Sequence, residues 1–72
     1  MNEYLVIYEP GDDNWSAYVP DLPGCVTTGV SRQQTERNML EAISLHVMAL
    51  RDTGQPIPAP AGEAGYLRVP ST

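Results

Sequence analysis

The sequence has 72 residues, nine of which are Asp or Glu and four of which are Lys or Arg, and its formal net charge at pH 7 is −5. This length predicts one domain, spanning residues 1–72, and a domain this small buries only about 60% of the surface that its unfolded chain exposes, so its own stability is limited. The basic residues are scattered arginines, and because phosphate backbones are bound by clustered Lys and Arg, the composition argues against direct nucleic-acid binding.

The first 30 residues predict three short strands separated by turns. Residues 3–9 contain the apolar and aromatic run Tyr4–Tyr8 and end at a Pro-Gly-Asp-Asp-Asn turn. A second strand is predicted over residues 14–19 and a third over residues 25–30, after a turn rich in Pro and Gly. Because the connections are short, the pattern favours an antiparallel meander.

A long helix is predicted over residues 32–52. Ser31, with Gln34 three residues later, is typical of a capping box, and Gly54 is suited to a left-handed C-cap. Apolar residues then follow at spacings of three and four, as in a helix that packs on a sheet. The predicted core-facing stripe consists of Thr35, Met39, Ala42, Ile43, His46, Val47 and Leu50.

The helix is expected to be longer than the sheet beneath it. It would span about 33 Å at ~1.5 Å per residue, whereas strands of about six residues reach only ~20 Å. Leu45 and Met48 lie off the core-facing stripe near the free end of this helix. We therefore expect them to be covered either by the following segment of the chain or by another subunit.

The C-terminal residues predict an extended segment and a closing strand. The proline-rich segment 55–60 cannot be helical. A short strand is predicted over residues 65–69, just before Pro70. The whole pattern predicts an α+β fold, a two-layer β-β-β-α-β domain with an antiparallel sheet packed on one long helix.

The aromatic residues of the strands predict a contact surface. Tyr4, Tyr8, Trp15 and Tyr18 cannot all face one helix, because successive side chains of a strand point to opposite faces. Aromatic residues contribute much of the energy of protein interfaces. With Leu45 and Met48 they form the candidate interface, and we expect a homo-oligomer, either a dimer or a tetramer.

Residues that could support catalysis are few. Glu9, Asp12, Asp13 and Asp21 fall in predicted turns and are interpreted as solvated loop residues. His46 is interpreted as a buried or interface histidine, with a catalytic or pH-dependent role as the less favoured alternative. Cys25 is interpreted as a small hydrophobic residue. We therefore expect no enzyme activity, no metal and no cofactor.

Compartment and membrane association follow from what the sequence lacks. Its first residues carry no basic signal-peptide region, and no run approaches the ~20 apolar residues of a membrane span. The single Cys fits a reducing compartment. The cytoplasm is the predicted location.

Several motifs resemble the HicB antitoxin family. They are the segment Val19–Cys25, Gly29, Asn38 with Glu41-Ala42-Ile43, and the segment Gly54–Pro60. The resemblance implies a partial ribonuclease-H-like fold that binds and neutralises a small basic HicA-like toxin, a ribonuclease with its own catalytic histidine. Family members usually continue into a DNA-binding module, and since Thr72 falls where it would begin, we expect no autorepression. The alternative is an orphan oligomeric domain that binds a small ligand or another protein.

Overall fold

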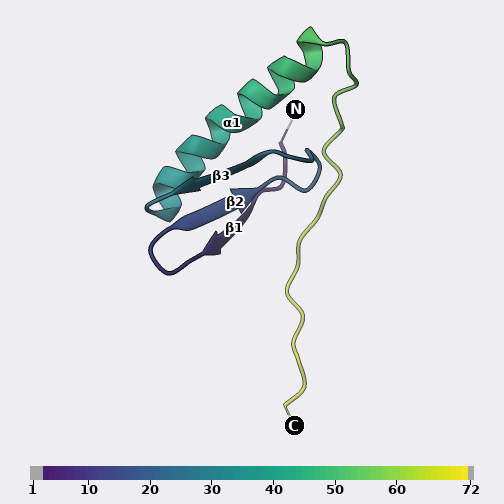
Figure 1. Cartoon of the computed structure of the whole chain (residues 1–72). Helices are drawn as coiled ribbons and strands as arrows, with labels where there is room; N and C mark the ends of the chain where they lie inside the picture. Colours follow the sequence, from purple (N-terminus) through teal and green to yellow (C-terminus); the bar gives the residue numbers. More distant parts are fainter. Residues whose placement is uncertain (1–2, 72) are drawn as a thin grey trace.

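A three-stranded sheet and one helix make up the fold. The computed structural model describes residues 3–71. Its elements, in chain order, are β1 (Ile7–Pro10), β2 (Trp15–Tyr18), β3 (Val26–Gly29) and α1 (Arg32–Asp52). The strands form one antiparallel sheet in the order β1-β2-β3, and α1 packs on one face of it, against β3 and β2 (Figure 1). The predicted α+β fold, with a meander followed by one long helix, is confirmed.

The strand register assigns each residue to one face of the sheet. Tyr8 lies opposite Ala17, and Ala17 lies opposite Thr27. Because Ala17 is buried, this row faces the helix. The adjacent row, Ile7–Tyr18–Val26, must then lie on the other face, since side chains alternate along a strand.

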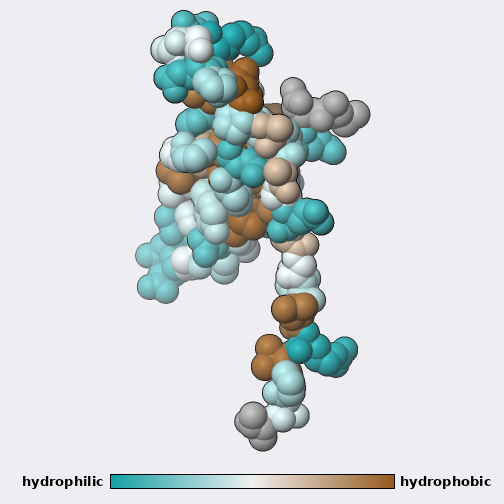
Figure 2. All heavy atoms as spheres, turned by 90° about the vertical axis from the view of Figure 1, so that its right-hand side faces the viewer, coloured by the Kyte–Doolittle hydropathy of each residue, from teal (hydrophilic) through white to brown (hydrophobic). Residues whose placement is uncertain are grey.

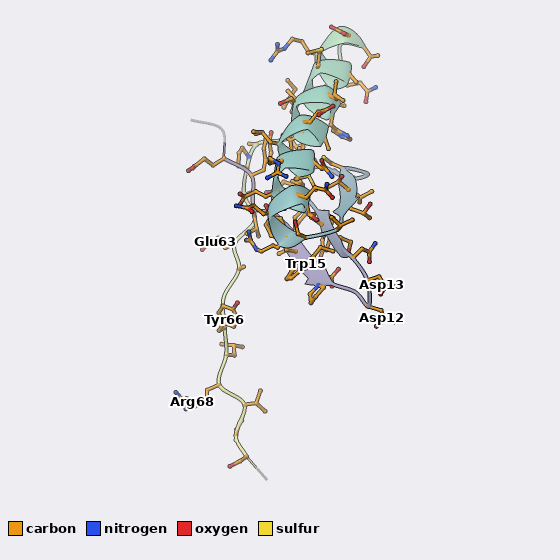
Figure 3. The ribbon with its side chains drawn as sticks, turned by 90° about the vertical axis from the view of Figure 1, so that its left-hand side faces the viewer. Asp12, Asp13, Trp15, Glu63, Tyr66 and Arg68 are labelled. Carbon is orange, nitrogen blue, oxygen red and sulfur yellow. The ribbon has the colours of Figure 1, made fainter. Side chains whose placement is uncertain are left out.

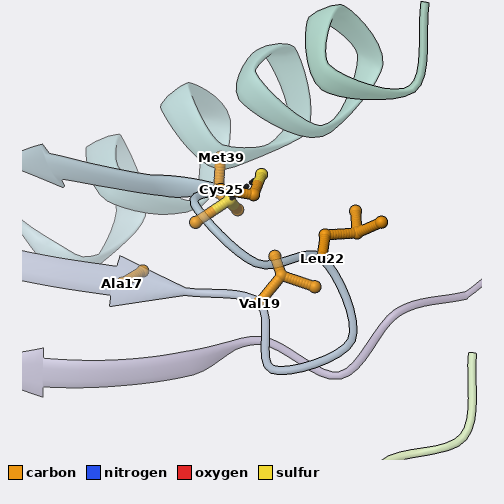
Figure 4. Close-up of a cluster of buried hydrophobic side chains, with 5 residues drawn as sticks. All are labelled: Ala17, Val19, Leu22, Cys25 and Met39. Atoms are coloured by element: carbon orange, nitrogen blue, oxygen red, sulfur yellow. Dashed lines mark hydrogen bonds between the residues drawn. The ribbon is translucent and has the colours of Figure 1, made fainter. Parts of the chain in front are cut away.

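The core lies where the β2–β3 loop meets the middle of α1 (Figure 4). Its buried hydrophobic residues are Ala17, Val19, Leu22, Cys25 and Met39. The Sγ atom of Cys25 lies 4.0 Å from the Sδ atom of Met39, so both sulfur atoms fill the space between loop and helix. Cys25 is therefore the small core residue that the sequence predicted.

The loop between β2 and β3 is built from two successive tight turns. The N–H of Leu22 donates to the carbonyl of Val19 at 3.1 Å, and the N–H of Cys25 donates to the carbonyl of Leu22 at 3.0 Å. Gly24 occupies the second turn with φ of 85°, a conformation that favours glycine, directly after Pro23. These turns aim Leu22 and Cys25 inward.

Both ends of α1 are capped by the residues that the sequence indicated. The Oγ atom of Ser31 accepts from the N–H of Gln34 at 3.0 Å, and Oε1 of Gln34 accepts from the N–H of Val30 at 2.7 Å. The reciprocal bond thus reaches one residue further back than in the usual capping box. At the other end, the N–H groups of Gly54 and Gln55 donate to the carbonyls of Arg51 and Leu50, which is the Schellman pattern.

The end of β3 packs directly against the first turn of α1 at Gly29. A Cβ atom on Gly29 would lie 2.5 Å from Oγ1 and 2.8 Å from the backbone nitrogen of Thr35. Thr35 is fully buried, and its hydroxyl donates to the carbonyl of Ser31 at 2.7 Å. Glycine is therefore required here for close approach.

The predicted core-facing stripe of α1 is buried most deeply near its start. Thr35 and Met39 are buried, whereas Ile43, Val47 and Leu50 are half-buried. The burial decreases because α1 continues past the end of the sheet, as its 21 residues and the four-residue strands require. Leu45 and Met48 remain 57% and 52% exposed, so the following segment of the chain leaves more than half of each side chain uncovered.

The prediction of a closing strand over residues 65–69 is wrong for the single chain. The segment is extended but pairs with no strand among the described residues, and Tyr66, Leu67 and Val69 project into solvent. Figure 2 shows this part of the chain as a narrow extended segment that leaves the body and carries hydrophobic residues. The physical reason is that a strand needs a neighbouring backbone to bond with, and this segment diverges from the sheet.

The bounds of α1 agree with the prediction, β2 and β3 are each one residue shorter at both ends, and β1 differs most. β1 begins at Ile7 and not at residue 3, because its partner β2 ends at Tyr18, opposite Ile7. Over residues 3–71 no helix has both the length and the apolarity needed to cross a bilayer.

Candidate partner-binding surface

The predicted interface residues lie in several different places, and two of the aromatic rings, Tyr4 and Tyr8, pack against the core. Tyr8 and Trp15 belong to rows on the helix side of the sheet, and both are half-buried. The guanidinium carbon of Arg32 lies 4.0 Å from the centre of the Tyr8 ring, a cation–π contact. Tyr8 therefore connects β1 to the start of α1 and offers only part of its surface to a partner.

Tyr4 and Met48 meet at the free end of the helix. The hydroxyl of Tyr4 donates to the carbonyl of Pro58, which fastens the proline-rich segment beside the N-terminal residues. Between this segment and α1 lies a hollow of about 320 Å³, which we call the helix-end hollow; it is lined by Tyr4, Ile43, Ser44, Val47, Met48, Arg51 and Ile57. The predicted cover of Met48 by the proline-rich segment is thus incomplete.

Leu45 lies on a different flank, above the edge of β3. With Thr27, Asn38, Glu41 and Ala42 it lines a shallow hollow of about 260 Å³. The side-chain amide of Asn38 donates to the carbonyl of Thr28 at 2.9 Å, so this flank is held to the outer edge of the sheet.

Of the aromatic residues in the predicted interface, Tyr18 lies on the face of the sheet that points away from the helix. It lies in the row Ile7–Tyr18–Val26, in which Tyr18 and Val26 are exposed. The next row, Glu9–Ser16–Thr28, is polar. We call these two rows together the open face; they place a narrow apolar stripe beside a polar row that includes a carboxylate.

Acidic side chains gather at the end of the open face. Glu9, Asp12 and Asp13 are exposed within five residues of one another, and Figure 3 shows Asp12 and Asp13 at the tip of the β1–β2 turn. In the described part of the chain the only ion pair joins Arg32 to Glu36, at 3.4 Å. Since no cation is paired there with Glu9 of β1 or with Asp12 and Asp13 of the turn, this end of the molecule carries a negative potential suited to a basic partner.

Asp21 has a different role, which local sequence patterns did not reveal. Its Oδ2 atom accepts from the N–H groups of Ala61 and Gly62, at 2.9 and 2.8 Å. These two hydrogen bonds lower the pKa of the Asp21 carboxyl below its ordinary value. Asp21 therefore anchors the C-terminal segment, and the 40-residue separation explains why no local motif could indicate it.

The remaining residues that could take part in catalysis or metal binding lie apart from one another. Burial raises the pKa of the Cys25 thiol, which keeps it protonated at neutral pH, and His46 lies half-buried on α1. Within the range 3–71, no three His, Cys, Asp or Glu side chains are grouped so that they could hold a metal ion. The arrangement described so far is suited to binding through shape and charge.

Comparisons with known proteins point in the same direction. A family model described as "HicB_like antitoxin of bacterial toxin-antitoxin system" matches residues 4–70. An uncharacterized 14.9 kDa protein from the rep-hol intergenic region of Haemophilus phage HP1 is 28% identical over 67 residues, which are 93% of this chain and 50% of that protein. The UPF0150 protein Ta0767 of Thermoplasma acidophilum is 32% identical over 58 residues, 81% of this chain and 84% of that protein.

The extent of these matches differs between the two relatives. This chain spans about half the length of the phage protein but covers most of the archaeal one. No solved structure matches. The matched range 4–70 includes the sheet, the helix, the proline-rich segment and most of the exposed C-terminal segment.

Proposed function

The chain belongs to the HicB-like antitoxin family, and from this premise we propose that it binds and neutralises a small basic ribonuclease toxin of the HicA-like kind through protein–protein contact. The observation that carries the proposal is the family match over nearly the whole chain. The catalytic groups would belong to the toxin. This chain would act in the cytoplasm by covering them, without catalysis of its own.

The open face is the surface on which we place the toxin. An apolar stripe beside charged residues has the composition of an interface, in which an apolar centre excludes water and a polar rim gives orientation. The acids Glu9, Asp12 and Asp13 would attract a basic protein and speed encounter. The arginines support a role without direct DNA binding, since Arg32 is already engaged by Glu36 and Tyr8.

Co-expression tests the proposal. If a short reading frame for a small basic protein lies beside this gene, its product should arrest growth, and this chain should relieve the arrest. Tyr18→Asp, which places a charge in the apolar stripe, should abolish relief. Leu40→Asp, an exposed position on the helix, should retain it. Complex formation should also weaken as salt rises, because the charge contribution is screened.

A second function is supported by the helix-end hollow. Its volume of about 320 Å³ and its apolar residues correspond to the low end of the range for small-molecule sites. In this alternative the chain is an orphan oligomeric domain that binds a small ligand or another protein. Absence of a neighbouring basic protein, together with a ligand-induced rise in melting temperature that Met48→Asp removes, would favour it over the antitoxin role.

Self-association accompanies either function in our proposal. Leu45 and Met48 are more than half exposed, and Tyr66, Leu67 and Val69 lie outside the body altogether. Apolar exposure on this scale is unusual for a monomer, and two-fold association is the commonest way to cover it.

A further inference from the structure

The C-terminal segment is fixed at its start and unsupported beyond it. Tyr4 and Asp21 hold the backbone of Pro58, Ala61 and Gly62 through hydrogen bonds. After Gly62 the chain leaves the body, and Figure 3 shows Glu63, Tyr66 and Arg68 along this departing segment. We call residues 63–70 the arm.

The arm has the sequence of a strand. Tyr66 and Val69 are residue types enriched in strands, Leu67 between them is apolar, and Gly65 and Pro70 bound the run. In extended backbone, Leu67 and Val69 point to one side and Arg68 to the other. The strand-like part, Tyr66–Val69, is as long as β1, which has four residues.

The structure leaves one edge of β1 unpaired beside this arm. Within residues 3–71, β1 pairs with β2 and with no other strand, so the backbone groups of its outer edge are available in that part of the chain. A Cβ on Gly62 would lie 3.5 Å from the side chain of Leu5, so the arm starts alongside the beginning of β1. From there both run downward in the view of Figure 1 and move apart, β1 to the left and the arm on the right.

A hollow occupies the space between β1 and the arm. Its volume is about 340 Å³, and it is lined on one side by residues 5–8, Trp15 and Arg32 and on the other by Ala64 and Tyr66. We call it the edge wedge. It has unpaired strand backbone on one side and strand-forming sequence on the other.

We propose that a second copy of this chain fills the edge wedge with its own arm, so that two copies exchange arms. If the arm turns alongside β1 and the two-fold axis is perpendicular to the strands, the arm of the second copy runs antiparallel to both β1 and the first arm. Each arm then lies between the β1 strand of one copy and the arm of the other. The two sheets and the two arms then form one continuous sheet. Because of the two-fold symmetry, the outer edges of both β1 strands gain backbone hydrogen-bond partners.

The side-chain pattern of both strands agrees with this pairing. Val6 and Tyr8 lie on the helix side of the sheet, packed against the core. If Val69 of the second copy lies opposite Tyr8 on that side, the antiparallel register puts Leu67 opposite Pro10 and Arg68 opposite Glu9, on the open face. Apolar residues thus meet apolar residues, and a cation meets an anion.

This inference deepens the self-association proposed above, and toxin neutralisation does not depend on it. Cysteine pairing between separately purified proteins tests it. Glu9→Cys protein, mixed with Arg68→Cys protein of different mass and oxidised, should give a mixed disulfide dimer. Thr28→Cys provides the matched control, since Thr28 lies in the same row as Glu9 but on the far edge of the sheet. Thr28→Cys protein mixed with Arg68→Cys protein should give at least ten-fold less mixed disulfide dimer than Glu9→Cys protein does.

A variant that carries Glu9→Cys and Arg68→Cys in one chain shows which copy the arm joins. Exchange gives a covalent dimer, and closure of the arm on its own chain gives a disulfide-linked monomer of nearly unchanged mass. A monomeric product, or equal yields with Thr28→Cys, would overturn the exchange.

Mass measurement in solution provides the second test. The unmodified chain should be a dimer by light scattering at micromolar concentration, and Leu67→Asp with Val69→Asp should weaken the dimer by about 100-fold. Val30→Asp, at an exposed position after β3 on the opposite edge of the sheet, should leave it unchanged. A monomer of 7.9 kDa, or a dimer insensitive to the arm variants, contradicts the proposal. Relief of growth arrest is read separately, so either proposal can fail alone.

Discussion

The β2–β3 loop and the arm contain similar apolar residues in opposite environments. Leu22 in the loop is 0% exposed, whereas Leu67 in the arm is 93% exposed. The loop is closed by two tight turns and covered by α1, so its apolar groups are buried within one chain. The arm has no such cover. The difference indicates that the first region stabilises the fold of the chain and that the second is available to another molecule.

Truncation of a leucine in each region should give the largest contrast. Leu22→Ala removes a fully buried side chain and should reduce the free energy of unfolding by about 3 kcal/mol, since buried leucine truncations cost ~2–5 kcal/mol. Leu67→Ala should change the stability of the folded monomer by less than about 0.5 kcal/mol. Urea denaturation at low protein concentration measures both, and equal losses would contradict the division into two regions.

Two glycines extend the comparison with a smaller expected effect. Gly29→Ala forces a Cβ against backbone and hydroxyl atoms of Thr35, and overpacking of this kind costs about 1–3 kcal/mol. Gly65→Ala meets no atom within 4 Å, so it should be close to neutral. The melting temperatures of the two variants check this expectation. A stable Gly29→Ala protein would mean that β3 and α1 can move apart.

Loss of the N-cap should reduce the stability of the fold by less than the Gly29→Ala substitution does. Ser31→Ala removes the oxygen that accepts from the N–H of Gln34, and the loss of such caps costs about 1 kcal/mol. Ser31→Asp, which retains an acceptor, is the matched control and should recover most of the stability. Circular dichroism during thermal unfolding measures both variants.

The smallest global effect is expected at Asp21, where the two regions join. Its pKa is lowered in the folded chain, so its hydrogen bonds to Ala61 and Gly62 are complete at neutral pH and are lost as pH falls through the folded pKa. The amide resonance of Gly62 should therefore shift in acid, while that of Met39 stays in place. Asp21→Asn should produce the acid-like Gly62 resonance at neutral pH. An unchanged resonance in this variant would contradict the anchor.

The parts of the fold that could be predicted from sequence depend on nearby residues. Ser31, Gln34 and Gly54 determine both ends of α1 through hydrogen bonds that span at most five residues. The three strands followed from their turns. The largest difference between the predicted and observed strand ends is the start of β1, because a strand extends only as far as its partner strand.

The parts that could not be predicted depend on distant residues. The segment 65–69 has strand-forming residues, but a strand exists only beside another backbone, and the single chain offers none there. The anchor at Asp21 joins residues 40 apart. The side of the sheet that α1 covers could not be predicted either. Strand alternation places Tyr8 and Trp15 on the same side of the sheet, but it does not show that this is the side facing the helix.

The sequence separations of these contacts also indicate an order of folding. The meander, the helix and their shared core connect residues that are close in the chain, so little loop-closure entropy opposes their formation. The contacts of the C-terminal segment join Tyr4 to Pro58 and Asp21 to Ala61, across 54 and 40 residues. We therefore expect this segment to dock after the transition state, so that Asp21→Asn accelerates unfolding and leaves the refolding rate unchanged.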